Sequence, residues 1–417
     1  MNYDIREYGA VGDGKTMNTQ AIQEAIDRCG RDGGGTVLIS GGRYKTGTIV
    51  LQSGVNLHLD YDGVLLGSDR CEDYPETLPL KHVTRELLPR KRAGCLIFAD
   101  ECDGISITGK GKIDCSGRAF IEPDAESEGK VNPWPYKRIE ALTPPRVLFF
   151  TGCSNVLLED FTLTNSPAGW ACWIHDCDFV NAARLKILVN VDFPNNDGIH
   201  INSSRNVSVS DCFLECGDDA IIVRANNSSL KENKVCEGVT VTNCTLRSHS
   251  AGIRVGWIND GTIRNCSFTN LVMIDCSVGI SIALPGHDQV ERWPDEGRED
   301  TKIEYLSFSN ITMDQGASCP IALEISDKPS THCAYMRNLY FHNMHCRCYQ
   351  LPIMYGTETC HLSEISFSDC TFEQMPMKPG ADVNHGPLLY YDGKSHQMYI
   401  KCVDNLSFNN TKFYAMQ

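Results

Sequence analysis

The sequence predicts an all-β chain that folds as a parallel β-helix preceded by one short α-helix. A recurring phrase carries apolar side chains at alternate positions and closes on Asp or Asn; copies begin at Asn155, Asn206 and Gly238. Such alternation is typical of a short half-buried strand, and a closing Asp or Asn is typical of the turn that follows it. The copies recur at irregular intervals and are rich in β-branched residues, which favours a β-helix over an α-helical solenoid.

The spacing of the copies predicts how the coils are organised. The closing residues lie at 160, 211, 243, 265, 310, 343, 369 and 410. One coil of 22 to 33 residues explains the short intervals, and the longer ones hold two coils or an inserted loop. Each coil packs only on its neighbours, so residues 1–417 are expected to form one elongated domain. The insertions expected on one side of this domain are 72–92, 116–145 and 284–302.

A helix is expected once, within an N-terminal cap of about residues 1–35. From Asn18 to Asp27 the apolar residues Ile22, Ala25 and Ile26 follow helical spacing after a capping residue. Such a helix covers the open end of the β-helix, where bare strand edges invite aggregation.

The cysteines are interpreted as packing residues. The chain has 21 cysteines, an odd number without the spacing of a disulfide scaffold. Cys212, Cys244, Cys266 and Cys370 each follow a closing Asp or Asn, which predicts a stacked internal ladder of reduced thiols. The segment from His342 to Cys348 is dense in metal-ligand types, but strand alternation sends neighbouring side chains to opposite faces. No metal site and no cofactor are therefore expected.

Composition limits the partners. The formal net charge of −15 argues against nucleic acid or an anionic membrane as partner, although a local basic patch is enough to hold an anionic polysaccharide. No run of 18 apolar residues predicts a transmembrane helix. The start Met1–Ile5 lacks the features of a secretory leader, so a cytoplasmic protein is expected, or an exported one if a leader has been removed. The oligomeric state is left open.

Three acidic residues form the candidate catalytic group. Asp197 and Asp219 precede two strands that align 22 residues apart, one coil above the other. Stacked strands lie about 4.8 Å apart, so these carboxylates are expected to face each other, with Asp218 level with Asn196. Crowded carboxylates push their pKa values apart, as general acid–base catalysis requires. The alternative is that Asn196-Asp197-Gly198 and Gly217-Asp218-Asp219 are only turns, whose residue types they share.

These motifs resemble those of a known family. Residues 8–14 followed by 18–22 look like the N-terminal signature of pectin-degrading β-helix proteins, and the two aspartate motifs resemble those of glycoside hydrolase family 28, the polygalacturonases. The resemblance covers roughly residues 3–415. It implies a right-handed single-stranded β-helix and an inverting hydrolase in which Asp218 is the general acid. Asp197 and Asp219 would then hold the attacking water.

Two motifs of that family are missing. Its Gly-His-Gly falls on 249–251, where Ser250 takes the histidine position and His249 is displaced by one residue. Its Arg-x-Lys, which binds the galacturonate carboxylate, falls on Ser281 and Ala283. Aligning the strands gives two outward columns, and Arg254 and Arg224 lie in them one and two coils earlier. These arginines are expected to pair with the three aspartates or to bind a uronate shifted along the cleft, and the two roles do not exclude each other.

The sequence thus predicts an inverting hydrolase of a pectin-type or related plant oligosaccharide, lacking the usual galacturonate clamp. Exo action is expected, because the insertions are placed to block the ends of the cleft. The alternatives are a non-catalytic carbohydrate-binding β-helix and a β-helix polysaccharide lyase. The candidate substrate-binding residues are Asn196, His200, Arg224, His249, Arg254, Trp257 and Trp293; core or loop packing is the alternative for the tryptophans.

Overall fold

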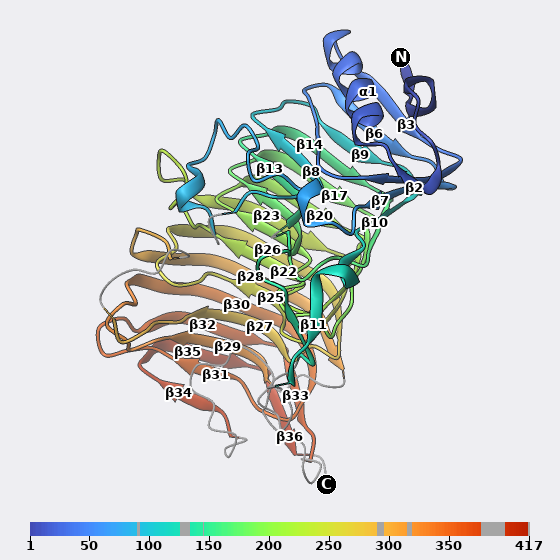
Figure 1. The fold of residues 1–417 in the computed structure, drawn as a ribbon. Helices are drawn as coiled ribbons and strands as arrows, with labels where there is room; N and C mark the ends of the chain where they lie inside the picture. The colour runs from blue at the N-terminus through green and yellow to red at the C-terminus, as the bar shows by residue number, and fades with distance from the viewer. Residues whose placement is uncertain are drawn as a thin grey trace.

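The computed structural model describes residues 1–89, 92–125, 134–144, 146–289, 296–314, 319–376 and 397–415. Its chain winds into a stack of coils that runs the length of the molecule, with the termini at opposite ends (Figure 1). The coils are built from parallel strands of two sheets, and this confirms the predicted β-helix. Among the described residues, no helix is long and apolar enough to cross a membrane.

The sheet that positions the site, here called sheet B, has eleven parallel strands in the described residues. In chain order they are β5 (Ile49–Val50), β8 (Ile97–Asp100), β13 (Arg146–Thr151), β16 (Trp170–His175), β19 (Ile199–Asn202), β22 (Ile221–Arg224), β25 (Ala251–Val255), β27 (Val278–Leu284), β29 (Cys319–Ile325), β31 (Ile353–Tyr355) and β34 (Tyr399–Lys401).

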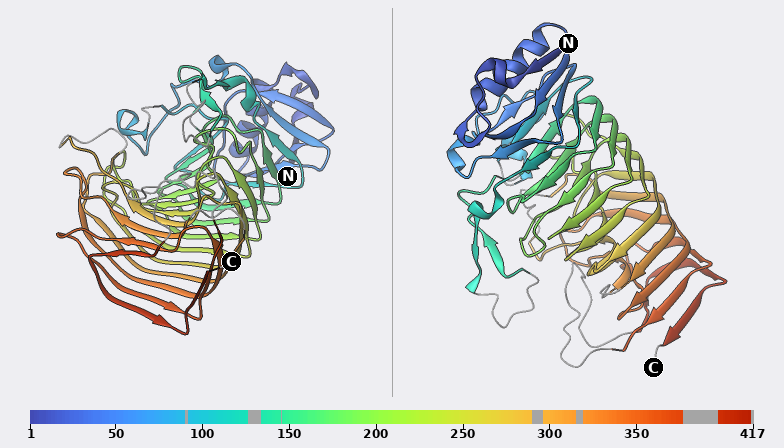
Figure 2. Two further views of the ribbon diagram at one scale, coloured as in Figure 1. Left: turned by 90° about the horizontal axis from the view of Figure 1, so that it is seen from below. Right: turned by 90° about the vertical axis from the view of Figure 1, so that its right-hand side faces the viewer.

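The larger sheet A bends around the rest of each coil (Figure 2). Its early strands are β1 (Asn2–Asp4), β2 (Asp13–Met17), β3 (Gly35–Ile39), β4 (Gly42–Thr46), β6 (Val55–Leu59), β7 (Gly63–Gly67), β9 (Ser106–Thr108), β10 (Lys112–Asp114), β14 (Ser154–Glu159), β15 (Thr162–Thr164), β17 (Asp178–Ala183) and β18 (Lys186–Leu188). Its later strands are β20 (Arg205–Ser210), β21 (Phe213–Cys216), β23 (Cys236–Thr242), β24 (Thr245–Ser248), β26 (Thr262–Ile274), β28 (Thr301–Asp314), β30 (Cys333–Cys348), β32 (Leu362–Ser368), β33 (Thr371–Gln374), β35 (Val403–Asn409) and β36 (Lys412–Ala415).

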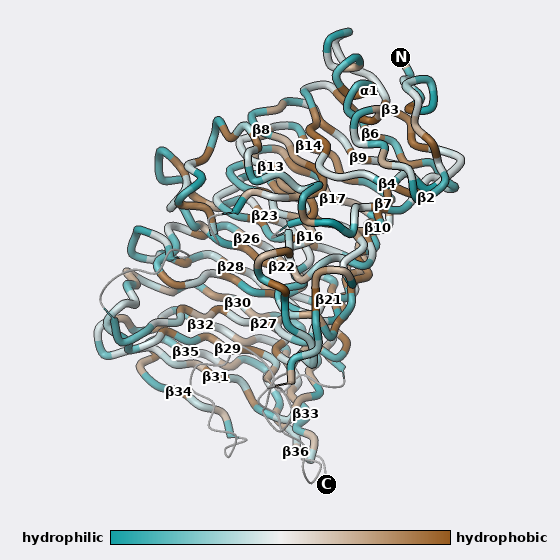
Figure 3. The backbone as a smooth tube through the Cα atoms, viewed as in Figure 1, coloured by the Kyte–Doolittle hydropathy of each residue, from teal (hydrophilic) through white to brown (hydrophobic). Residues whose placement is uncertain are grey.

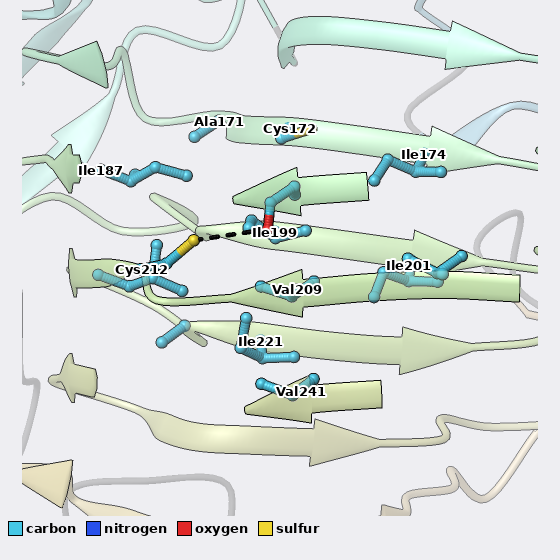
Figure 4. Packing of buried hydrophobic residues seen from close by; sticks show 14 of the residues in the cluster. Ala171, Cys172, Ile174, Ile187, Ile199, Ile201, Val209, Cys212, Ile221 and Val241 are labelled. Carbon is cyan, nitrogen blue, oxygen red and sulfur yellow. Dashed lines mark hydrogen bonds between the residues drawn. The ribbon is translucent and has the colours of Figure 1, made fainter. Parts of the chain in front are cut away.

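The core lies between the two sheets. Buried residues alternate with less buried ones along strands of sheet A such as β14 and β20, and hydrophobic segments recur from coil to coil (Figure 3). Ile199 and Ile221 of sheet B meet Val209 and Val241 of sheet A in this interior (Figure 4). Burial of an aliphatic side chain contributes about 1.5–3 kcal/mol, and the repetition of this contact from coil to coil holds the stack together.

The expected cap is present at the N-terminal end. Helix α1 (Thr19–Arg31) buries Ile22, Ala25 and Ile26 against the first coil, as its apolar spacing predicts. Asn18 precedes it but does not cap it through its side chain. That side chain instead accepts a hydrogen bond from the Val11 N–H at 2.7 Å, which ties the opening loop to the helix. Short 3-10 helices lie at Ile5–Tyr8, Cys71–Asp73, Arg85–Leu87 and Gly117–Phe120.

One predicted copy of the phrase is out of register. The structure gives each copy two left-handed residues five positions apart, and Asn265 (φ 55°) opens its copy while Asn270 (φ 55°) closes it. Asn270 lies in a ladder of side-chain amides: it donates to Asn243 at 3.3 Å and accepts from Asn310 at 3.1 Å. The placement of the closing turn at Asn265 is therefore wrong. The error arose because Asn serves both turns.

The same shift changes the cysteine ladder. Cys212 and Cys244 occupy the position after the closing turn, and Leu271 takes that place in the next coil. Cys266 pairs with Leu306 in a different column, so its assignment to the ladder is wrong. The predicted burial holds nonetheless, because Cys212, Cys244 and Cys370 are at most 3% exposed. All 21 cysteines are free thiols in the structure.

The three insertions differ in structure. The described part of 72–92 packs Leu78, Val83 and Leu88 against Phe149 and Trp173 of sheet B. The described part of 116–145 carries the antiparallel strands β11 (Ile121–Pro123) and β12 (Tyr136–Arg138). The insertion 284–302 lies partly outside the described residues, and so does Trp293.

Candidate active site

The three aspartates lie where two neighbouring strands of sheet B begin. In β19 and β22, Ile199 pairs with Ile221, so Asp197 and Asp219 occupy equivalent positions two residues before their strands. The Gly198 N–H donates to the Asp219 carbonyl at 2.9 Å, which ties the two turns together. This is the alignment that the 22-residue spacing predicts.

Asp219 is held by an extensive set of partners. Arg254 on β25 donates its Nε–H to Oδ2, and its Nη2 lies 3.4 Å from Oδ1. Oδ1 also accepts from the Ser250 hydroxyl at 2.8 Å and from the Ala251 N–H at 3.0 Å. Asp219 and Arg254 are both nearly buried, so their charges compensate each other away from water. Of the two alternatives for Arg254, the structure shows the pairing with an aspartate of the group.

Asp218 has the environment of a proton donor. Burial, followed by the negative charge of the adjacent Asp219, raises its pKa from 3.8 to about 7, although Arg254 opposes the rise. Its Oδ1 accepts the Asp219 N–H at 3.1 Å, and Asn195 lies 3.4 Å from its Oδ2. The Ser248 hydroxyl donates to its carbonyl at 2.6 Å. Asp218 is therefore a carboxyl group that keeps its proton near neutral pH while its backbone is fixed.

Asp197 lies beside a buried histidine that packs on a tryptophan. Its Oδ2 lies 3.8 Å from Nδ1 of His200, which is buried and packs on the Trp170 ring with centroids 4.4 Å apart. Desolvation lowers the pKa of His200 well below 6.5, with the nearby Arg224 adding to the effect, so this imidazole is neutral. The Asn196 side chain is also buried and donates to the Asn190 carbonyl at 3.0 Å, which fixes the preceding loop.

Arg224 is bound to an acid other than the three aspartates. Its Nε and Nη2 donate to the two carboxylate oxygens of Asp260 at 3.1 and 2.8 Å. Asp260 is fully buried and also accepts the Ala225 N–H at 3.3 Å. The expectation that Arg224 pairs with the catalytic group is therefore wrong, because an acid 36 residues further along the chain takes that place.

The other candidates are distributed around this centre. Trp257 is half-buried, and its ring lies 5.0 Å from the Arg254 guanidinium, which places it beside the Asp219 pair. His249 is half-buried next to Ser250, and its carbonyl accepts the Ser277 hydroxyl at 2.7 Å. Trp134, from the insertion 116–145, donates to the Gly217 carbonyl at 2.5 Å, directly before Asp218.

The register of sheet B defines two outward columns. The first contains Phe98, Phe149, Trp173, His200, Ile222, Arg254, Ser281, Ala322, Ile353 and Tyr399. The second contains Asp100, Thr151, His175, Asn202, Arg224, Gly256, Ala283, Glu324, Tyr355 and Lys401. Ser281 and Ala283 occupy the places at which the sequence lacks the family's cations.

A strap formed by residues 78–89 closes the N-terminal side of this face. Its Leu78, Val83 and Leu88 form a buried apolar cluster with Phe149 and Trp173, which lie two coils and one coil above Asp197. Backbone and side-chain contacts secure the strap. The Thr84 N–H donates to the Ser229 carbonyl at 2.9 Å, and the Ser228 hydroxyl to the Leu87 carbonyl at 3.3 Å.

Arg146 is the main polar anchor of the strap and was not among the sequence candidates. It is 1% exposed, lies 4.0 Å from the Trp173 ring centroid, and donates to the Pro89 carbonyl at 3.3 Å and the Arg92 carbonyl at 2.6 Å. The sequence offered no signal for it, since its partners are backbone carbonyls more than 50 residues away.

Comparisons with known proteins point to one family. A family model described as "Glycosyl hydrolases family 28" matches residues 89–235, the part of the chain that contains all three aspartates. A "Probable polygalacturonase" of Vitis vinifera is 28% identical over 66% of this chain and 55% of its own length. An "Exo-poly-alpha-D-galacturonosidase" of Dickeya chrysanthemi is 26% identical over 89% of this chain and 71% of its own length. These matches support membership of glycoside hydrolase family 28.

Solved structures agree on the fold of this chain. The Family 28 exopolygalacturonase of Yersinia enterocolitica aligns with 100% of this chain and 78% of its own at a TM-score of 0.70 and 21% identity. An exopolygalacturonase of Thermotoga maritima aligns at a TM-score of 0.64 and 18% identity over 99% of this chain and 92% of its own. The comparisons confirm the predicted family, the class of enzyme and the right-handed β-helix.

Proposed function

We propose that this family 28 protein is an inverting, exo-acting glycoside hydrolase that cleaves a pectin-type oligosaccharide next to a neutral sugar. One observation carries the proposal: a carboxyl group with its pKa raised to about 7, Asp218, stands beside an aspartate whose charge Arg254 compensates. Glycoside hydrolysis by inversion needs one protonated carboxyl for the leaving oxygen and a carboxylate that activates water on the opposite face of the sugar.

The contacts assign the roles. Asp218 protonates the glycosidic oxygen, because its pKa leaves it protonated up to about neutral pH. Asp219 already accepts hydrogen bonds at both oxygens, so it helps to hold the water but is a weak base. Asp197 is then the main base that takes the proton from the water, with neutral His200 beside it.

The charges in the cleft favour a neutral sugar at the cleavage site. In the described residues of the two outward columns, the cations are Arg224, Arg254 and Lys401. Arg224 is bound to Asp260 through two hydrogen bonds, and Arg254 is bound to Asp219. Lys401 lies on β34, the last strand of sheet B, far along the stack from Asp219. It donates to the Tyr355 hydroxyl at 2.7 Å. A uronate at the cleavage site would have to displace an aspartate from its arginine.

The strap supports exo action. Because Leu78, Val83 and Leu88 cover the outward face directly above β19, a polysaccharide has no room to continue past Asp197 in that direction. The relatives in Dickeya chrysanthemi and Zea mays carry exo-acting names, which supports the same mode. A pectic backbone is favoured by the names of these relatives, while the paired arginines favour a neutral residue within it.

Hydrolysis of a defined panel tests the proposal. Purified protein is incubated with linear galacturonate oligomers and with pectic oligomers that contain neutral sugars, and product anomers are followed by NMR. We expect inverted monomer or dimer released from one end of a neutral-sugar-containing oligomer. Retained anomeric configuration, or a mixture of internal fragments, contradicts the mechanism. Binding without turnover supports the carbohydrate-binding alternative, and ultraviolet absorbance from a new double bond supports the lyase.

A further inference from the structure

Two cysteines outside the candidate active site lie in contact. Cys333 is the first residue of β30, and Cys360 lies in the turn before β32, one coil further on. Their sulfur atoms are 3.0 Å apart. The turn that carries Cys360 is fixed, because its N–H donates to the Thr357 hydroxyl at 3.0 Å and its carbonyl accepts the Thr357 N–H at 3.0 Å. The contact is therefore set by the backbone of two neighbouring coils.

This pair lines an open pocket, where Cys333 is partly exposed and Cys360 is 7% exposed. The pocket has a volume of about 480 Å³ and is lined by Cys333, Cys360, Tyr355, Thr357 and Lys401 among others. It lies at the end of sheet B away from the aspartates, beside the last strands β31 and β34. A small oxidant in water therefore reaches these sulfur atoms without unfolding of the coils.

The other neighbouring thiols lie in the interior. Cys212 and Cys244 also interact, with the Cys212 N–H 3.4 Å from the Cys244 sulfur, but they are only 3% and 2% exposed. Burial inside the stack denies them contact with a dissolved oxidant, whatever their separation. Cys102, Cys153 and Cys177 form a third set of neighbouring thiols, at most 8% exposed. Among the described residues, the Cys333–Cys360 pair differs from the other two sets in lining the open pocket and in having one partly exposed member.

We propose that Cys333 and Cys360 form a reversible redox site, which a hydroperoxide converts into a disulfide that joins two successive coils. Hydrogen bonding from the Cys333 thiol lowers the pKa of Cys360, so Cys360 supplies the thiolate. It attacks one peroxide oxygen, the O–O bond breaks, and the other oxygen leaves as water after protonation. The sulfur of Cys333 then loses its proton and attacks the sulfenic sulfur of Cys360, the S–O bond breaks, and a second water leaves. The two sulfurs lose two electrons in total and hydrogen peroxide gains them.

The test uses the purified, reduced, full-length protein. It is treated with a small excess of hydrogen peroxide, blocked with N-ethylmaleimide and digested without reduction for mass spectrometry. We expect a peptide linked between Cys333 and Cys360, a thiol count that falls by two from 21, and recovery of the count with dithiothreitol. The Cys333→Ser variant should stop at a Cys360 sulfenic acid that dimedone traps.

Matched variants make the outcome decisive. Cys212→Ser removes one member of the buried pair and should leave formation of the Cys333–Cys360 link unchanged. Cys360→Ser should abolish the rapid loss of thiols. Linkage of Cys360 to the half-exposed Cys402, equally fast oxidation of Cys212 and Cys244, or no linked peptide at all overturns the proposal. The readout is chemical, so it is independent of whether the protein hydrolyses any sugar.

Discussion

Replacing Asp218 by Asn is predicted to damage catalysis and stabilise the fold at once. The variant keeps the shape of the side chain but has no proton to give, so turnover should fall by about 10²–10⁴-fold. The rise of the Asp218 pKa from 3.8 to about 7 means that the folded state holds a proton that the unfolded state releases. A difference of about three pH units corresponds to about 4 kcal/mol at 1.36 kcal/mol per unit.

The pH dependence of this effect has a fixed sign. Because the folded pKa is raised, the contribution of Asp218 to stability is complete below about pH 4 and is lost as pH rises through about 7. Asp218→Asn should therefore melt higher than wild type at pH 8, by an amount equivalent to at most about 4 kcal/mol, and the gain should shrink towards pH 4. Thermal unfolding across this range measures it.

One control variant and two possible results test the acid role of Asp218 and its effect on stability. Asp314→Asn changes a half-exposed aspartate that pairs with Arg347 on sheet A and should leave the rate unchanged. A near-normal rate for Asp218→Asn removes Asp218 from the acid role. A lower melting temperature at pH 8 refutes the electrostatic reasoning, because it shows that the charged carboxylate stabilises the fold.

Four further predictions follow from the same contacts. For wild type, kcat/KM should fall as pH rises through about 7, where Asp218 loses its proton, and a pH profile without that limb contradicts the assignment. Arg254→Met should move this limb to higher pH, since Arg254 lowers the Asp218 pKa, and should cost about 3–5 kcal/mol in denaturant unfolding because it leaves Asp219 buried and unpaired. Unsubstituted polygalacturonan should be a poor substrate in a reducing-sugar assay, whereas efficient release of galacturonate would show that Arg224 or Arg254 exchanges its aspartate for substrate. Arg146→Met should loosen the strap, destabilise the fold by about 2–3 kcal/mol and add internal fragments to the products seen by chromatography.

Local patterns predicted the coils and the placement of the aspartates, since both depend on neighbours in sequence. The period-2 phrase determines which side chains point inward, and the 22-residue spacing of Asp197 and Asp219 determines their stacking. The register failed at Asn265 for a local reason: the same residue type satisfies the left-handed backbone at both turns of a coil. Only the pairing of Asn270 with Asn243 and Asn310 distinguishes the two turns.

The parts that the sequence did not predict are contacts between distant segments. Asp260 lies in a turn after β25, and nothing in its neighbourhood signals that it takes both donors of Arg224. Arg146 is bound through backbone carbonyls of the strap, which carry no residue type that a pattern can recognise. In a β-helix, the repeat positions the strand residues, but each inserted loop is positioned by contacts of its own. The loops that border the cleft are therefore harder to predict from sequence than the strand residues of sheet B.

The position of one arginine connects acidity with specificity in this site. A cation at Ser281 or Ala283 would face substrate, whereas Arg254, one coil earlier in the first column, reaches Asp219. There it compensates the charge that otherwise drives the pKa of Asp218 still higher, and so keeps the acid near neutrality. The same pairing removes its charge from the substrate's side of the cleft. Under the proposed mechanism, an arginine that tunes the acid is not available as a carboxylate clamp. The same ion pair therefore supports both the raised, but not extreme, pKa of Asp218 and the proposal of a neutral sugar at the cleavage site.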